Sequence, residues 1–364
     1  MLPSNDVGQW ILLTGQTPKG EHILSLLLKR SYKITRNHRC QRAEKDRKLI
    51  PADQYYNEPI NSSVKFESDF IPWKIATDVV FNATAYAPNE QTAQQIIASV
   101  MIGKHRKDLL ITGHRIAHYQ PNKPPLFSEP EPFLTIPLTY ENAYGGVDVY
   151  SDPETSCAYI RNPIGKGFAI KNTATSINQL ALPNIECIDD QLTPERLVTE
   201  HFMHWENQPL PDGFAWFAKN WQPRSQYAGI MPADRPTEQE LRAAYSKFIP
   251  EEQQLLYQQT TLPDMDFRFF NGASSNLALP YLQGDETIKT RHITPYGDYM
   301  FQLPNDKPQI ILDIGNGIQQ PESILHTVMV HLDDYEVDLT WRAAIHYSGM
   351  DWLPMMKKFT LHIE

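Results

Sequence analysis

Two pairs of histidines are the first residues in this chain whose type and spacing could support chemistry. His114 and His118 are four residues apart, and His201 and His204 are three residues apart. On a helix, either spacing would place both imidazoles on one face, where they could hold a zinc ion. The residues around His114 favour a strand instead, in which positions four apart are separated by ~13 Å. His201 and His204 lie on a predicted helix but lack a third ligand, so we predict no metal site.

Serine and cysteine chemistry is not indicated by any local motif. The chain contains no G-x-G-x-x-G, G-x-x-x-x-G-K-[ST] or G-x-S-x-G sequence, so neither a phosphate-binding loop nor a nucleophile elbow is predicted. Ser274 and Ser275 have no such context, and Cys157 and Cys187 have no histidine near them in the sequence. We therefore predict no catalytic residue, no metal and no cofactor.

Two pairs of an aromatic and a cationic residue are more unusual. Trp73 is followed by Lys74, and Trp221 lies three residues before Arg224. An aromatic ring beside a cation can stack on it or anchor a partner protein. The alternative is that each tryptophan is buried at a turn. We take these four residues as the candidate partner-binding residues.

Composition limits the classes of partner and the compartment. The chain has 364 residues, of which 41% are hydrophobic and 21% charged, and its net charge is −10. This balance suits a globular protein and argues against nucleic acid or an anionic membrane as the main partner. The three cysteines form no C-x-x-C pair, no signal peptide is visible, and no apolar run approaches the ~20 residues that span a bilayer. We therefore expect a cytoplasmic protein.

Alternating apolar residues predict strands along most of the chain. Residues 77–87, 95–103 and 109–117 are predicted to form an antiparallel three-stranded unit, with a polar turn at 104–108. Residues 9–34 hold two predicted strands, the second with a half-buried pattern. Further strands are predicted at 298–303, 310–314, 326–332, 334–345 and 359–363.

Helical signals are few and short. Thr193 and Pro194 resemble a helix start and predict a helix over 193–205, and a possible capping box predicts another over 238–248, followed by a third to residue 259. We expect a mainly β protein, with antiparallel sandwich- or barrel-like sheets and a few short helices. The chain is predicted to be a single domain over residues 1–364, with a possible helical insertion near 190–260.

Several sequence blocks, in order along the chain, resemble the family called domain of unknown function 2169. The resemblance covers roughly residues 20–345 and departs from the family's pattern at 231–261, where a helical segment intervenes. The blocks are Glu67-Ser68-Asp69, Trp73-Lys74 and Thr77-Asp78-Val79; Ala85-Tyr86-Ala87-Pro88; Gly113-His114-Arg115; Pro137, Leu138, Tyr140, Glu141, Ala143, Gly145 and Gly146; Asn162-Pro163, Gly165 and Gly167-Phe168; Leu182-Pro183-Asn184; Trp221, Pro223 and Arg224; Leu262-Pro263-Asp264, Asp266-Phe267 and Phe269-Phe270; Gly284-Asp285-Glu286; Phe301-Gln302-Leu303-Pro304; and residues 338–342.

The resemblance implies a non-catalytic role in bacterial type VI secretion. It implies a cytoplasmic adaptor or chaperone that binds a toxic effector protein and helps to load it onto a spike protein of the VgrG or PAAR type. No nucleic acid and no membrane is expected as a partner. Because no active site is established for the family, the resemblance implies no catalytic residue.

Two alternatives remain open. One is a hydrolase-like enzyme whose site is assembled from loops around His201, His204, Asp264 or Asp266. The other is a structural component of the secretion particle itself.

Overall fold

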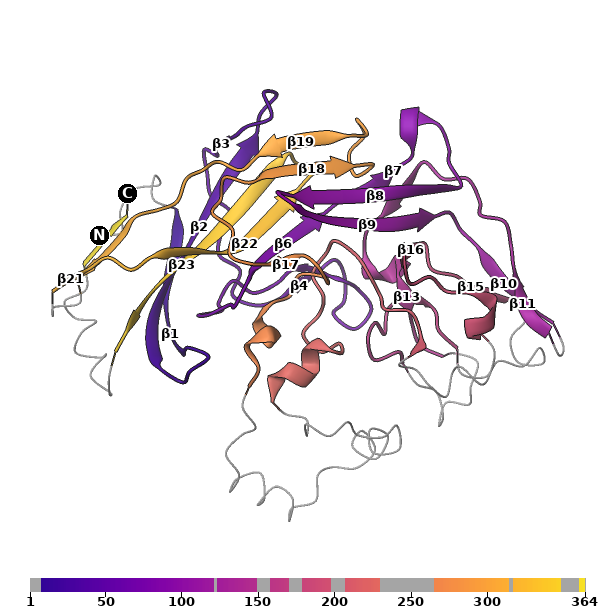
Figure 1. Cartoon of the computed structure of the whole chain (residues 1–364), viewed down its shortest axis with the longest axis horizontal. Helices are drawn as coiled ribbons and strands as arrows, with labels where there is room; N and C mark the ends of the chain where they lie inside the picture. Colours follow the sequence, from indigo (N-terminus) through magenta and orange to yellow (C-terminus); the bar gives the residue numbers. More distant parts are fainter. Residues whose placement is uncertain are drawn as a thin grey trace, which may run out of the picture.

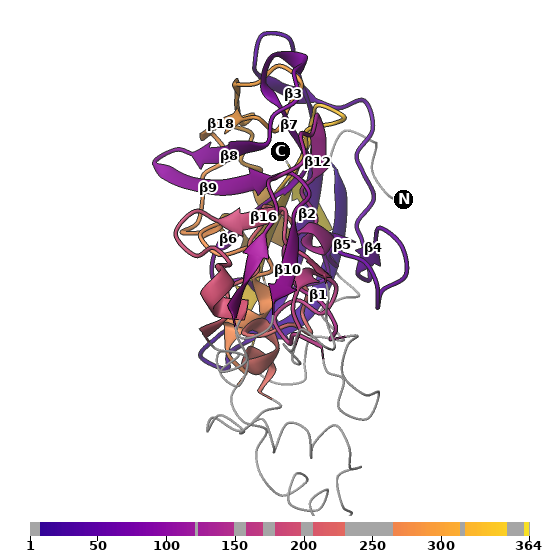
Figure 2. The same cartoon turned by 90° about the vertical axis from the view of Figure 1, so that its right-hand side faces the viewer.

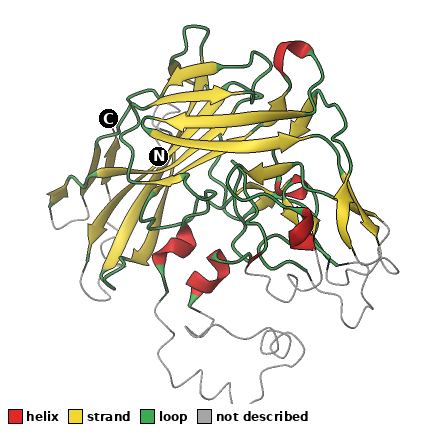
Figure 3. Ribbon diagram, turned by 45° about the vertical axis from the view of Figure 1, so that its right-hand side comes forward, coloured by secondary structure: helices red, strands yellow, loops and turns green. Residues whose placement is uncertain are grey.

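Two β-sheets packed face to face form the body of the protein (Figure 1). The structure, a computed structural model, describes residues 8–120, 123–148, 158–169, 179–197, 207–229, 265–313, 317–347 and 360–363. Strands dominate this part of the chain, and its helices are short 3-10 turns (Figure 3). The prediction of a mainly β fold with antiparallel sheets is confirmed, and the sheets do not close into a barrel.

The larger sheet has seven strands in the order β1-β2-β23-β22-β6-β17, with β3 paired to the end of β2. Every neighbouring pair is antiparallel except β6 with β22, which run parallel. The strands are Gln9–Gln16 (β1), His22–Ile34 (β2), Cys40–Arg42 (β3), Thr77–Asn82 (β6), Ala278–Leu279 (β17), Ser323–His331 (β22) and Glu336–His346 (β23).

The smaller sheet has five antiparallel strands in the order β16-β9-β8-β18-β19. Its strands are Ile185–Cys187 (β16), His105–Thr112 (β9), Gln95–Ile102 (β8), Thr287–Arg291 (β18) and Tyr299–Gln302 (β19). Strands β8 and β9 form a hairpin that crosses over the larger sheet (Figure 1).

Short strand pairs and turns connect the two sheets. The remaining strands are Gln54–Tyr55 (β4) with Val64–Phe66 (β5), Thr84–Tyr86 (β7) with Thr135–Pro137 (β12), Ile116–Gln120 (β10) with Lys123–Phe127 (β11) and Gln179–Ala181 (β15), Tyr144–Gly145 (β13) with Lys166–Gly167 (β14), and Ile310–Asp313 (β20) with Ile318–Gln319 (β21) and Thr360–Ile363 (β24).

One hydrophobic core fills the space between the two sheets. Leu26 of β2 and Trp341 of β23 enter it from the larger sheet, and Val100 of β8 and Phe301 of β19 enter it from the smaller one. Because side chains alternate along a strand, each of these strands sends every second residue into the core. Removal of this apolar surface from water is the main force that holds the two layers together.

The other face of the larger sheet is covered by the segment that carries β4 and β5 (Figure 2). The Nζ atom of Lys29 lies 2.5 Å from a carboxylate oxygen of Asp69, and the Ser31 N–H donates to Asp46 at 2.8 Å. The prediction that β2 is half-buried is therefore wrong. Most of the polar face of β2 is also buried, because Lys29 and Ser31 have partners in the covering segment, and only Lys33 on that face is exposed.

The predicted three-stranded unit over residues 77–118 is also wrong. Strand β6 belongs to the larger sheet, where it pairs with β22 and β17, whereas β8 and β9 belong to the smaller sheet. The third predicted strand ends at Thr112, because Gly113 lies against another segment and a Cβ atom there would be 1.8 Å from the Glu131 carbonyl oxygen. The predicted polar turn at 104–108 is shorter, because β9 already begins at His105.

The predicted helices are only partly visible. Within 193–205 the structure describes a 3-10 turn over Pro194–Leu197, and the predicted helices at 238–248 and up to residue 259 lie outside the described residues. The other 3-10 turns are Pro88–Glu90, Tyr140–Asn142, Arg224–Ala228 and Phe267–Phe270. No helix in the described ranges has the length and apolar composition needed to cross a membrane.

Candidate functional site

Three of the four candidate partner-binding residues lie in the interior. Lys74, Trp221 and Arg224 are each 4% exposed, whereas Trp73 is half-buried. The Trp221 ring packs edge-on against Tyr140, with 5.3 Å between the ring centroids. A partner protein does not reach these three side chains in this conformation. The structure instead shows their contacts with other residues of the same chain.

Arg224 forms a bidentate ion pair with Glu67 in the interior of the protein. Its Nη1 and Nη2 atoms lie 2.9 Å and 2.5 Å from the two carboxylate oxygens of Glu67, and it also donates to the carbonyls of Phe217 and Phe269. Burial by itself would raise the pKa of Glu67, but the charge and hydrogen bonds of Arg224 outweigh it and hold that pKa below its ordinary value. Such a planar, bidentate pair fixes the geometry of both side chains.

Lys74 forms a second buried ion pair beside the first. Its Nζ atom lies 2.6 Å from Asp78 and 3.1 Å from the hydroxyl of Thr327 on β22. Asp78 also accepts hydrogen bonds from the side chain of Asn271 and from the N–H of Gly272. Asp78 therefore joins the sheet to the loop at residues 271–273.

Gly272 lies between the two ion pairs. A Cβ atom at this position would be 2.0 Å from Oε2 of Glu67 and 2.6 Å from Nη1 of Arg224. The structure thus brings Lys74 and Arg224 into one network through the loop that contains Gly272. Trp73 lies apart from this network, against Arg342 of β23.

A third buried ion pair, between Lys107 and Asp212, is one that the sequence reasoning missed. The two charged groups are 2.5 Å apart, and Lys107 also donates to the hydroxyl of Ser274 at 2.7 Å. Burial lowers the pKa of Lys107, and the charge of Asp212 opposes that shift. The sequence did contain a signal for the burial of Lys107, because Lys107, Leu109 and Ile111 alternate on β9 and all face inward.

The residues considered for enzyme chemistry form no catalytic arrangement in the described part of the chain. His114 and His118 are exposed, and Asp266 accepts a hydrogen bond from the N–H of Arg268 at the start of a 3-10 turn. No group of three His, Cys, Asp or Glu side chains in the described ranges is arranged to hold a metal ion. His201, His204, Cys157 and Asp264 lie outside the described residues.

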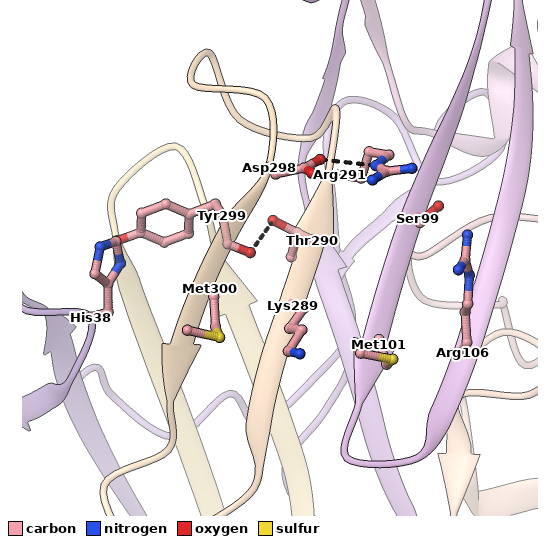
Figure 4. Close-up of a pocket in the computed structure, with 10 residues that line it drawn as sticks. All are labelled: His38, Ser99, Met101, Arg106, Lys289, Thr290, Arg291, Asp298, Tyr299 and Met300. Atoms are coloured by element: carbon pink, nitrogen blue, oxygen red, sulfur yellow. Dashed lines mark hydrogen bonds and ion pairs between the residues drawn. The ribbon is translucent and has the colours of Figure 1, made fainter.

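The outer face of the smaller sheet carries a shallow hollow of about 420 Å³ (Figure 4). Met300 of β19, Lys289 of β18, Met101 of β8 and Arg106 of β9 follow one another across four neighbouring strands. The strand register explains this row, since each residue lies directly opposite the next. Their side chains point outward because the residues between them along each strand face the core.

The outer edge of the larger sheet is a second open surface. Strand β1 is the last strand on that side and pairs only with β2 among the described strands. Its sequence, QWILLTGQ, contains no charged residue and no proline, and Ile11, Leu12 and Leu13 are half-buried. Charged residues and prolines on the edge strands of soluble proteins usually prevent pairing with another chain. Strand β1 contains neither kind of residue.

The backbone of β1 is oriented for pairing. The Thr17 N–H donates to the Glu21 carbonyl at 2.9 Å at the end of the β1–β2 hairpin. Because alternate residues of an antiparallel strand bond to the neighbouring strand, Leu13 and Gly15 bond to β2, and the backbone groups of Leu12 and Thr14 point away from it. Within the described ranges, no group bonds to the outward N–H and C=O of Leu12 and Thr14.

The family described as "uncharacterized protein conserved in bacteria (DUF2169)" matches residues 19–342 of this chain. The chain belongs to DUF2169. Searches of curated proteins and of solved structures found no match.

Several DUF2169 blocks quoted from the sequence converge in space. Glu67, Lys74 and Asp78, from the first block, meet Arg224, from a block about 150 residues later, around the loop at Gly272. These residues therefore have a structural role in this chain. Lys107 and Asp212, which form the third ion pair, were in none of the quoted blocks.

Proposed function

We propose that this DUF2169 protein is a cytoplasmic adaptor or chaperone that binds a type VI secretion effector and helps to load it onto a VgrG or PAAR-type spike. The open edge of β1 is the observation that supports this proposal most directly. It offers an uncharged, apolar strand with outward backbone groups at Leu12 and Thr14. A polypeptide can use such an edge by adding one strand to the sheet.

In this mechanism, an extended segment of the effector pairs with β1. Its backbone bonds to the outward groups of Leu12 and Thr14, and these bonds supply affinity with little dependence on sequence. The side chains of Ile11 and Leu13 lie on one face of β1 and that of Leu12 on the other, so both faces of the added strand meet apolar surface. A segment held in this way has one of its two backbone edges covered, which limits its pairing with other copies of itself.

A proline at position 14 tests this mechanism. Thr14→Pro removes an N–H that points away from β2, so the β1–β2 ladder stays intact while the added strand loses a hydrogen bond. We expect Thr14→Pro to weaken binding of a type VI effector toxin by about tenfold, measured with the two purified proteins. Thr14→Ala is the matched control, because it shortens the same side chain and keeps the N–H.

Equal binding by Thr14→Pro and the wild type would exclude the β1 edge as the binding surface. Failure of the wild-type protein to bind the toxin, together with normal secretion of that toxin by a deletion strain, would overturn the adaptor role. A constant ratio of this protein to the spike after secretion would instead favour a structural component of the particle.

A further inference from the structure

We propose that the hollow on the smaller sheet binds an acidic, extended segment of a partner polypeptide. The hollow lies on β8, β9, β18 and β19, whereas the binding edge proposed above is β1 of the larger sheet. The inference rests on the proposed function only in taking the partner to be a polypeptide.

Lys289 gives the hollow an unneutralised positive charge at its centre. It is exposed on β18 between Met300 and Met101, and no carboxylate of the described residues lies within ion-pair distance of it. The other cations nearby are Arg106, paired with Asp108 at 2.8 Å, and Arg291, paired with Asp298 at 2.9 Å. Both pairs are largely exposed, and such pairs exchange partners at little cost. The surface is therefore locally cationic on a protein whose net charge is −10.

Ser99 supplies a polar group that has no partner. It lies on β8 opposite Arg291, is 7% exposed, and its hydroxyl has no hydrogen-bond partner. A buried hydroxyl without a partner is unfavourable, because it has lost its bonds to water. Ser99 lies in the lining of the hollow, so movement of the flexible side chains around it would let its hydroxyl donate to a bound carboxylate.

Methionines make the same surface suitable for a polypeptide. Met300 is 47% exposed, Met101 is partly exposed, and Ile97 of β8 is exposed on the same face. Methionine side chains are flexible and polarisable, so they adapt to apolar groups of different shapes. A ligand that alternates acidic and apolar residues would satisfy both kinds of contact.

The spacing of the cations specifies the ligand further. Lys289 and Arg291 are two residues apart on β18, so their Cα atoms are separated by ~7 Å. Two acidic residues separated by one residue have the same spacing in an extended chain. Nucleic acid fits less well, because Asp108 and Asp298 lie among the cations and would repel a continuous row of phosphates.

Fluorescence anisotropy with a labelled synthetic peptide tests the inference. The probe has glutamate at every second position with valine between, and its control has glutamine in place of glutamate. For the full-length protein at about 50 mM salt, we expect the glutamate peptide to bind about tenfold more tightly than the glutamine peptide, and raising the salt to about 300 mM should reduce that difference.

Charge reversal locates the site. Lys289→Glu is expected to weaken binding of the glutamate peptide about tenfold, and Ser99→Ala about threefold. Lys123→Glu is the matched control, because it makes the same charge change at an exposed lysine on β11 and should alter binding less than twofold. Thr14→Pro should leave binding of this peptide unchanged, which separates the hollow from the β1 edge.

Four results would overturn the inference. Equal losses in Lys289→Glu and Lys123→Glu would show that only net charge matters. Displacement of the peptide by low concentrations of inorganic phosphate would show that the hollow binds small anions. Tighter binding of an oligothymidylate than of the peptide, lost in Lys289→Glu, would identify a nucleic-acid site instead. If the peptide fails to bind while the effector still binds the wild type, the adaptor role stands without this site.

Discussion

The guanidinium carbon of Arg342 lies 3.7 Å from the centre of the Trp73 ring. Arg342 is 5% exposed, its Nε atom has no hydrogen-bond partner, and no described carboxylate forms an ion pair with it. The other buried cations of the described chain, such as Lys74 and Arg224, each have a carboxylate partner. Burial lowers the pKa of Arg342 to about 10. The tryptophan ring is thus a group in direct contact with this buried charge that can compensate it.

Replacing Arg342 by methionine should therefore be tolerated. The change removes a buried charge that has no counter-ion and keeps a flexible side chain over the Trp73 ring. We expect the free energy of unfolding of Arg342→Met to be unchanged or raised by up to ~2 kcal/mol, measured by urea denaturation. A loss of several kcal/mol would mean that the stacked cation contributes more than its burial costs.

The same substitution at Arg224 should have the opposite effect. Arg224→Met removes the bidentate partner of the buried Glu67 carboxylate and leaves it with only Lys219, whose Nζ atom lies 3.3 Å away. Breaking a buried pair costs up to ~3–5 kcal/mol. Denaturation at neutral pH measures the loss. If Arg224→Met and Arg342→Met have equal stabilities, the Glu67–Arg224 pair is not a main support of the fold.

The effect of Arg224→Met should also depend on pH. In the wild type the pKa of Glu67 is lowered on folding, so its contribution is complete above about pH 4.5 and is lost as the pH falls through the folded-state value. In the variant, only Lys219 and Lys74 remain to oppose the effect of burial, so the pKa of Glu67 rises above its wild-type value and the variant loses stability relative to the wild type as the pH rises. We therefore expect the difference between wild type and variant to be smaller at about pH 4.5 than at pH 7. A difference that does not vary over this range would contradict the coupling.

Gly272→Ala should destabilise the protein because the added methyl group would overlap Glu67 and Arg224. We expect a loss of ~3 kcal/mol or more, since both neighbours are fixed by the ion pair. Gly297→Ala is the control: no atom lies within 4 Å of the Gly297 Cβ position, and the strain there comes only from its φ of +78°. That change should cost only ~1 kcal/mol. Similar losses at the two positions, measured by thermal unfolding, would show that the contact at Gly272 relaxes easily.

A double-mutant cycle tests the Lys107–Asp212 pair. Lys107→Met alone leaves Asp212 buried and unpaired, and it should cost ~3–5 kcal/mol. Adding Asp212→Asn removes the unpaired charge, so the double variant should be more stable than Lys107→Met alone by at least ~1 kcal/mol. Additive losses in urea denaturation would show that the two side chains do not interact in solution.

The sequence was sufficient to predict which residues form strands but not which strands pair. Alternation predicted β8, β22 and β23 within a few residues of their observed bounds. It could not show that β6 pairs with β22, because alternation reports the face of a strand and carries no information about its neighbours. The assumption that consecutive strands pair with one another therefore led to the wrong prediction of a three-stranded unit at residues 77–118.

Buried charge was the second feature that the sequence did not reveal. Lys74 and Arg224 were predicted as partner-binding residues, and both are buried. Lys107 was assigned to a polar turn because it lies among five charged or polar residues. A lysine enters a core only when a carboxylate meets it there, and Asp212 is about 100 residues away in the sequence.

The pairing of β2 with β23 joins two segments that lie far apart in the sequence. Residues 23–33 form a continuous ladder with residues 336–346, so nearly the whole chain must leave the ribosome before β2 gains its neighbour. Until then, one of the longest apolar strands has an unpaired side, and the nascent chain requires protection from aggregation. A premature stop codon that removed β23 would leave no stable fragment, because the central strand of the larger sheet would be missing.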